Sequence, residues 1–204
     1  PYPVEIMERA ARRYGLQKKL PGMVEASQKL QYAEARVKME LCRRNHPALA
    51  GICHFNAMDI GLSPQGIVDE HYDLKITDAA TWRRTNGDTV IMMDRDFHDR
   101  VLQEGSRAAF TLSVSDFSHP PLQSPELEWR LTAGEEVIGE GRIDFRHRSF
   151  RTCRAGRASV RLPDCASPTV LTLSARLHEG ERVFENAWPD RKSTRLNSSH
   201  RYVS

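Results

Sequence analysis

The hydrophobic pattern of the first 44 residues predicts two helices. In residues 4–14, apolar side chains recur every three or four positions, which is the spacing of one helix face, and Gly15 follows as a stop signal. A second helix is predicted to begin after Pro21-Gly22 and to run to about Arg44, because Pro47 disfavours helical backbone just upstream of it. Its apolar stripe consists of Leu30, Ala33, Val37 and Leu41.

Residues 48–56 (ALAGICHFN) form a nearly continuous apolar run that is too short for a globular helix. Such a run is typical of a parallel strand that is buried on both faces. Because it follows a helix, we interpret the two segments as half of a βαβ unit.

The pattern changes after about Lys75, from helical periods to short alternating runs separated by turns. This spacing predicts an antiparallel β-sandwich without helices. Glycines at Gly134 and Gly180 mark two hairpin turns, and the prolines between residues 120 and 168 all fall between runs. The predicted strands are 89–93, 108–115, 126–132, 137–145, 158–162, 169–177 and 183–187.

The two ends of the chain do not fit either pattern. Residues 1–3 carry no starting methionine and no signal-peptide pattern, so we expect an arbitrary cut there. Residues 191–204 lack periodicity and resemble the translated adapter tail found in assembled environmental reads, so we expect them to be non-native and unstructured. The predicted division is therefore 1–78, 79–190 and 191–204.

Charge and cysteine content exclude several classes of function. The 204 residues carry a net charge of +3 from 30 basic and 27 acidic residues that are interspersed, so we expect neither a nucleic-acid nor a membrane partner. The arginine-rich segment 142–161 alternates with apolar positions, as a solvated strand face does. The four cysteines have no metal-ligand spacing; Cys153 and Cys165 could meet across a strand pair, but we expect reduced thiols.

Three local features follow one another along residues 50–188. Ala50-Gly51-Ile52 enters the predicted buried strand, Asp59 follows it, and Gly66-Ile67-Val68-Asp69 leads to Lys75. The predicted sandwich comes next and closes on Asn186-Ala187-Trp188. In this order the features resemble the C-terminal part of bacterial exo-β-glycosidases of the glycoside hydrolase family 2 type, which includes β-galactosidases, β-glucuronidases and β-mannosidases.

The resemblance implies a fold and an activity for the whole protein. It implies a remnant of a (β/α)₈ barrel, with its last strand and helices, followed by an all-β immunoglobulin-like sandwich. In a rival placement, residues 44–47 (RNHP) resemble the motif that precedes the fourth barrel strand in this family, which would put Ala57 where the family has its acid/base glutamate. The rival placement would require further strand-helix units downstream, but the downstream residues show only the pattern of β-strands. We therefore prefer the placement at the end of the barrel.

The same resemblance places both catalytic glutamates upstream of this chain, so we predict no catalytic residue, no metal and no cofactor here. The parent would be a retaining hydrolase of terminal β-linked sugars, which needs two carboxyl groups. Asn56, Asp59 and His54, at the end of the predicted strand, are the candidates for sugar binding within the complete barrel. The structural alternatives are a core position for His54 and a capping role for Asp59.

Two other classes of function remain as alternatives. A free-standing carbohydrate-binding module would display a row of exposed aromatic residues, and the sequence has no such row; Trp129 is in phase with Leu127 and Leu131 and is predicted to face the core. An adhesion-type immunoglobulin domain would have a cysteine upstream of its tryptophan within the sandwich, and that cysteine is missing.

Overall fold

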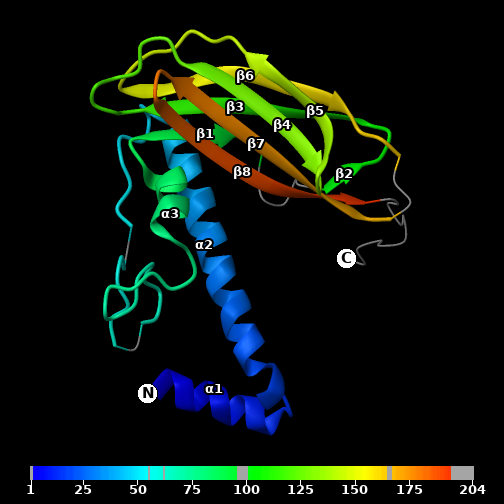
Figure 1. Cartoon of the computed structure of the whole chain (residues 1–204). Coiled ribbons are helices and arrows are strands. Elements are labelled where there is room, and N and C mark those ends of the chain that lie inside the picture. The colour runs from blue at the N-terminus through cyan, green and yellow to red at the C-terminus, as the bar shows by residue number, and fades with distance from the viewer. Residues whose placement is uncertain (1, 55, 62, 96–100, 165–166, 194–204) are drawn as a thin grey trace.

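The computed structural model describes residues 2–54, 56–61, 63–95, 101–164 and 167–193. A β-sandwich makes up most of it, and a helical region extends from one end (Figure 1). The helices are α1 (Tyr2–Arg13), the short 3₁₀ helix η1 (Gln17–Lys19), α2 (Leu20–Arg44) and α3 (Ala79–Asn86). The strands are β1 (Thr89–Met93), β2 (Val101–Gln103), β3 (Arg107–Asp116), β4 (Glu126–Ala133), β5 (Glu136–Ile143), β6 (Arg151–Arg161), β7 (Thr169–Glu179) and β8 (Arg182–Ser193).

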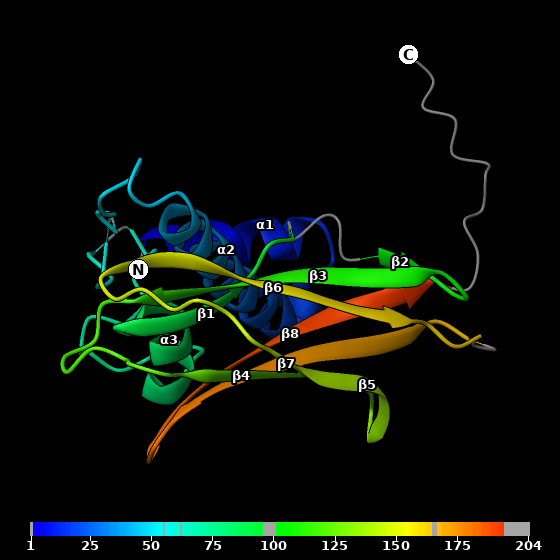
Figure 2. The ribbon, with the colours of Figure 1, turned by 90° about the horizontal axis from the view of Figure 1, so that it is seen from above.

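The strands form two sheets that face each other (Figure 2). One sheet has the order β1-β3-β6, and the other has the order β2-β8-β7-β4-β5. All neighbours are antiparallel except β2, which runs parallel to β8. The alternating inner positions of both sheets fill one core, which includes Phe110, Leu112, Leu131, Leu173 and Trp188.

The structure confirms the predicted sandwich and the seven predicted strands within it. Gly134 and Gly180 have φ angles of 61° and 58° in the two hairpin turns, where a side chain would be strained. β6 is longer than predicted because its pairing with β3 continues through the arginine-rich segment to Arg151. Sequence patterning missed β2, since a three-residue strand has no period and forms only through its distant partner β8.

Trp129 packs against the core from the inner face of β4, as its phase with the leucines predicted. Two glycines on the neighbouring strand β5 provide its space. A Cβ atom at Gly141 would lie 3.0 Å from the Trp129 Nε1 atom, and a Cβ atom at Gly139 would lie 2.7 Å from Val160 Cγ2 on the other sheet. A side chain at Gly141 would therefore collide with the Trp129 ring on the neighbouring strand, and one at Gly139 would collide with Val160 on the facing sheet.

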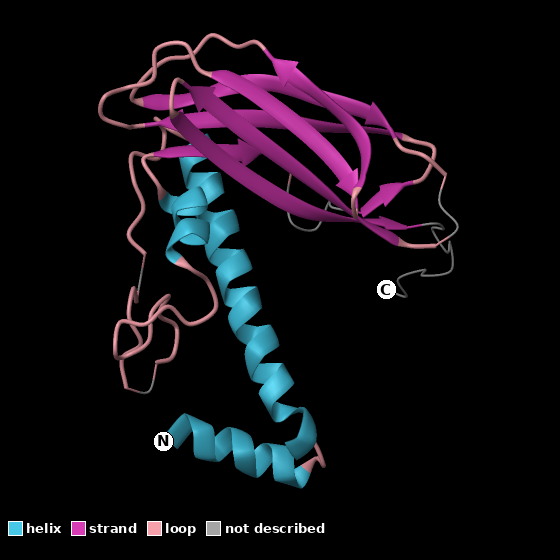
Figure 3. Ribbon diagram, viewed as in Figure 1, coloured by secondary structure: helices cyan, strands magenta, loops and turns pink. Residues whose placement is uncertain are grey.

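The two predicted N-terminal helices are also confirmed, but the buried face of α2 differs from the predicted stripe. Leu30 and Leu41 are 50% and 47% exposed, whereas Ala35, Met39 and Glu40 are buried. Only the C-terminal half of α2 reaches the sandwich, and its N-terminal half extends away from the sandwich toward α1 (Figure 3). The apolar stripe thus lies on a face of α2 that the sandwich does not cover.

The prediction of a buried strand at residues 48–56 is wrong for the residues that the structure describes there. These residues form no strand, and Leu49 and Ile52 are 45% and 44% exposed. A parallel strand exists only between hydrogen-bonding neighbours, and this segment has none beside it. A barrel remnant is therefore not seen in the described part of the chain.

Two further differences concern the borders of the predicted regions. The structure contains helix α3, which is too short for a clear period but has a cap: Asp78 accepts hydrogen bonds from the Thr81 backbone and hydroxyl at 2.7 and 2.8 Å. Residues 191–193, expected to be unstructured, continue strand β8, and 194–204 lie outside the described residues. Cys42, Cys53 and Cys153 are free thiols; Cys165 also lies outside the described residues.

Candidate functional site

Asp59 holds together the loop that follows the expected strand. Its Oδ1 atom accepts hydrogen bonds from the Gly66 backbone at 2.7 Å and from Lys75 Nζ at 3.0 Å, and Lys75 also donates to the Pro64 carbonyl at 3.1 Å. The side chains of Lys75 and Asp59 are only 9% and 20% exposed. A Cβ atom at Gly66 would lie 2.3 Å from the Asp59 backbone nitrogen, so this turn requires glycine.

The other two predicted sugar-binding residues have separate local partners. Asn56 adopts a positive φ of 62° and donates from Nδ2 to the Ser63 hydroxyl at 3.1 Å. The His54 ring packs edge-on against Trp82, with 6.2 Å between centroids. Within the described part of the chain, no hydrogen bond or ring contact joins His54, Asn56 and Asp59 to one another, and their role in sugar binding stays a prediction.

The Asn186-Ala187-Trp188 motif lies where α2 meets the sandwich. Trp188 is fully buried, and its Nε1 atom donates to Glu40 Oε1 at 3.1 Å. Arg36 donates to the same Glu40 oxygen at 2.8 Å and to Asn186 Oδ1 at 2.9 Å, and its guanidinium lies over the Trp188 ring at 5.2 Å. We call Arg36, Glu40, Asn186 and Trp188 the helix junction.

Asn186 extends the helix junction to two further elements. Its Nδ2 atom donates to the Ile91 carbonyl on β1 at 2.8 Å and to the Arg84 carbonyl on α3 at 3.2 Å. The ion pair between Arg36 and Glu40 is nearly buried, with side chains 15% and 4% exposed. Removing one partner would leave a buried charge without its counter-ion, so α2 is fixed to the sandwich by interdependent contacts.

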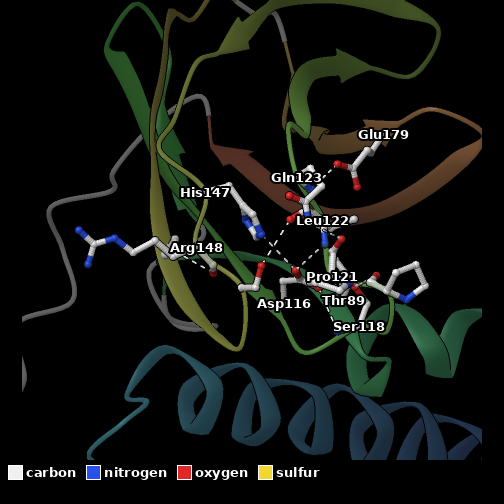
Figure 4. A network of polar contacts seen from close by, with 12 residues as sticks. Thr89, Asp116, Ser118, Pro121, Leu122, Gln123, His147, Arg148 and Glu179 are labelled. Carbon is white, nitrogen blue, oxygen red and sulfur yellow. Dashed lines mark hydrogen bonds and ion pairs between the residues drawn. The ribbon is translucent and has the colours of Figure 1, made fainter.

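A second polar network lies inside the sandwich around Asp116 at the end of β3 (Figure 4). Asp116 is fully buried and accepts hydrogen bonds from the Thr89 hydroxyl at 2.9 Å, the Ser118 hydroxyl at 2.6 Å and the Leu122 backbone at 3.3 Å. Burial alone would raise the pKa of Asp116, but the hydrogen bonds from Ser118, Thr89 and Leu122 outweigh it and leave this pKa below its ordinary value.

Glu179 fixes the other end of the same connection between β3 and β4. It accepts a hydrogen bond from the Gln123 backbone (Figure 4), and others from the Ser124 backbone and from Arg182. Arg182 also donates to the Pro120 carbonyl at 2.6 Å. Desolvation opposes ionisation, but the backbone hydrogen bonds and Arg182 keep the pKa of Glu179 lowered. Both carboxylates therefore act as anchors of residues 117–125.

The Asp116 network contains the residue types of a hydrolytic triad without its geometry. His147 Nε2 lies 3.1 Å from Asp116 Oδ2, but the Ser118 hydroxyl donates to Asp116 and not to the imidazole. In a triad, the histidine takes the proton of the serine hydroxyl, whereas here Ser118 and His147 each contact a different oxygen of the Asp116 carboxylate. The arrangement is that of a structural network.

A groove of about 500 Å³ lies along the outer face of the five-stranded sheet. Its charged side chains neutralise one another: Arg130 pairs with Glu140 at 2.9 Å and Arg142 pairs with Glu128 at 2.9 Å. Glu185 pairs with Arg176 at 3.4 Å, and also with Arg84. Among the described residues, no three metal-ligating side chains converge, and no helix is long and apolar enough to span a membrane.

Comparison with known proteins gives one matching family model, and it covers the sandwich. Residues 106–189 match a model described as a domain of unknown function, DUF8488. The match runs from the start of β3 into β8 and leaves the helices out. The curated proteins contain no match.

Several solved structures are similar to this chain at low identity. A Parabacteroides merdae β-glucuronidase is 5% identical with a TM-score of 0.35, covering 52% of this chain and 13% of that one. A Bifidobacterium dentium β-glucuronidase is 14% identical with a TM-score of 0.30, covering 53% and 17%. A Bacteroides uniformis β-glucuronidase is 16% identical with a TM-score of 0.27, covering 74% and 17%.

The chain thus spans less than a fifth of the length of these β-glucuronidases. A chimeric titin tandem is 18% identical with a TM-score of 0.26, covering 47% of this chain and 45% of that one. The comparisons amount to a weak structural relationship with these solved structures, β-glucuronidases among them.

Proposed function

We propose that this chain is the accessory β-sandwich region of a retaining glycoside hydrolase that acts on terminal β-linked sugars. In this proposal the sandwich supports the catalytic barrel and does not cut glycosidic bonds itself. Sugar would be bound by the complete parent barrel, with Asn56, Asp59 and His54 contributed from this chain.

The helix junction is the observation that carries the proposal. The Asn-x-Trp motif that the sequence shares with the resembled enzymes is neither surface-exposed nor merely part of the core. Asn186 binds β1 and α3, and Trp188 binds Glu40 of α2. A motif that ends the sandwich and fixes a helix from the preceding segment suits a domain whose task is to hold its neighbour in place.

Two properties of the described residues agree with a supporting role. The buried carboxylates Glu40 and Asp116 are both occupied by structural donors. On α2, the exposed stripe that includes Leu30 and Leu41 offers an apolar surface of the kind that a helix of a larger barrel would bury.

Activity measurement tests the non-catalytic part of the proposal. The chain should give no turnover above blank on aryl β-galactoside, β-glucuronide and β-mannoside, and hydrolysis that survives further purification would overturn it. The glycosidase part is tested by the coding sequence upstream of residue 1. It should contain a strand ending in Asn-Glu and a second strand-end glutamate; an open reading frame without them would contradict the proposal.

The supporting role is tested by hydrogen exchange in the helix junction. Asn186→Ala should increase exchange of backbone amides in residues 35–44 by at least tenfold, because α2 loses the contact of Arg36 with Asn186, through which it is joined to the Ile91 and Arg84 carbonyls. The matched control is Asn45→Ala, whose exposed side chain donates to the Leu41 carbonyl of its own helix at 2.8 Å. Equal exchange in the two variants would show that the junction does not hold α2.

A further inference from the structure

The outer face of the β1-β3-β6 sheet carries a row of arginines that no ion pair neutralises. β3 and β6 pair antiparallel, with Arg107 opposite Arg161, Thr111 opposite Arg157 and Ser113 opposite Arg154. The register shift between Leu112 and Ser113 keeps Arg154 on the same face as the others. We call Arg107, Arg154, Arg157 and Arg161 the arginine face; all four are exposed.

The arginine face differs in its electrostatics from the outer face of the other sheet. None of its four guanidinium groups lies within ion-pair distance of a carboxylate in the described part of the chain. Like charges directly opposite on paired strands destabilise a sheet, and Arg107 and Arg161 are such a pair. The free protein therefore bears a repulsion that a bound anion would relieve.

The composition of the arginine face indicates which anion it suits. The guanidinium group presents a planar fork of donors that matches carboxylate, sulfate or phosphate oxygens in pairs. The side chains between the arginines are Ala109, Thr111 and Ser159, which offer hydroxyl groups and no aromatic ring. Without rings for base stacking or apolar side chains for lipid insertion, this face does not have the features of a single-strand nucleic-acid site or a membrane anchor.

The shape of the arginine face favours a linear ligand. From Arg154 to Arg161 the strand advances roughly 23 Å. At the Arg154 end the face stops at α2, where Thr152 donates to the Arg43 carbonyl at 2.6 Å and Arg43 donates to Ser115 at 3.3 Å. The surface is thus a flat strip that is open along one direction and bounded by a helix at one end.

We infer that the arginine face binds a linear acidic polysaccharide through its uronate carboxylates. The anionic character of the ligand follows from the arginines alone; its identification as a carbohydrate rests on the proposed function. Hydroxyl groups of the sugar rings would meet Thr111 and Ser159, and successive carboxylates would meet successive guanidinium groups.

The test measures binding of the whole chain to polygalacturonate by calorimetry at low and physiological salt. Arg157→Gln with Arg161→Gln should raise the Kd at least tenfold, and binding of the unaltered chain should weaken as salt increases. The matched control is Arg130→Gln with Arg176→Gln, which removes the same charge from the groove on the other sheet and should change the Kd less than twofold. Neutral galactan should not bind.

Four outcomes would overturn the inference. These are no binding of polygalacturonate, equal weakening by both double variants, tighter binding of poly(dT) or of phosphatidylserine vesicles, and tighter binding of poly-glutamate. Circular dichroism should show both variants folded, since Arg161→Gln removes a repulsion. The proposed supporting role would survive each of these outcomes, because hydrogen exchange at the helix junction and the upstream glutamates test it separately.

Discussion

The sandwich and the helical arm, which comprises residues 2–34, bury their apolar side chains to very different extents. In the sandwich, Phe110, Leu112 and Leu173 are at most 1% exposed. In the arm, Val4 and Met23 are each 52% exposed. The sandwich closes its own core, whereas most of the arm extends away from it; near its end, Gln31 donates to the Gly66 carbonyl and Tyr32 contacts α3. Regular secondary structure alone therefore does not make the arm stable.

The strongest test of this difference is Trp188→Ala, because Trp188 belongs to both the sandwich core and the helix junction. We expect a loss of about 3–5 kcal/mol in the free energy of unfolding. Urea denaturation followed by circular dichroism measures it. Trp188→Phe keeps most of the volume but loses the hydrogen bond to Glu40, so it should cost clearly less. Similar costs for the two variants would mean that packing contributes little at this position.

Met39→Ala should separate the two regions. Met39 is 2% exposed on the buried face of α2, so the substitution should cost about 2–4 kcal/mol and loosen the docking of the helix. Limited proteolysis of the unaltered chain should cut in the arm and spare residues 35–188. In the variant, residues 35–44 should also be cut. Rapid cleavage within 35–44 of the unaltered chain would instead place the domain boundary near residue 80, as the sequence suggested.

Acid should affect the sandwich through Asp116. Because its pKa is lowered on folding, Asp116 contributes stability that is present above its unfolded pKa of about 3.9 and is lost as pH falls through the folded value. Asp116→Asn should cost about 2–3 kcal/mol at pH 7. The variant should also lose less stability than the unaltered chain between pH 5 and pH 2. Glu179 also has a lowered pKa, but it is present in both proteins and contributes equally to their pH dependence. If the urea midpoints of the variant and the unaltered chain changed in parallel with pH, Asp116 would not have this role.

The smallest effect is expected in the arm. Leu30→Gln replaces a side chain that is 50% exposed, so the free energy of unfolding should change by less than about 0.5 kcal/mol. The measurement is the urea denaturation described for Trp188→Ala; applied to Met39→Ala as well, it makes Leu30→Gln and Met39→Ala a matched pair on one helix. A cost above about 1 kcal/mol would show that the arm contacts something in solution, such as a second copy of the chain.

The candidate site was less predictable than the fold. Asp59, Gly66 and Lys75 were singled out from the sequence, and the structure joins them by hydrogen bonds within one loop. Trp188 was recognised as part of a motif, but its partner Glu40 lies 148 residues away and had no signal in the sequence. A buried glutamate on a helix reads as a surface residue until the chain that covers it is known.

The sequence by itself determined the strands of the described sandwich other than β2, the two hairpin turns and the two N-terminal helices. Each of these follows from local periodicity, or from a glycine that supplies a positive φ. Tertiary structure decided which face of α2 is buried, that residues 48–54 form no strand, and that β2 exists. These outcomes depend on neighbours distant in the chain: a strand needs partners for its hydrogen bonds, and a helix buries whichever side meets a packed surface.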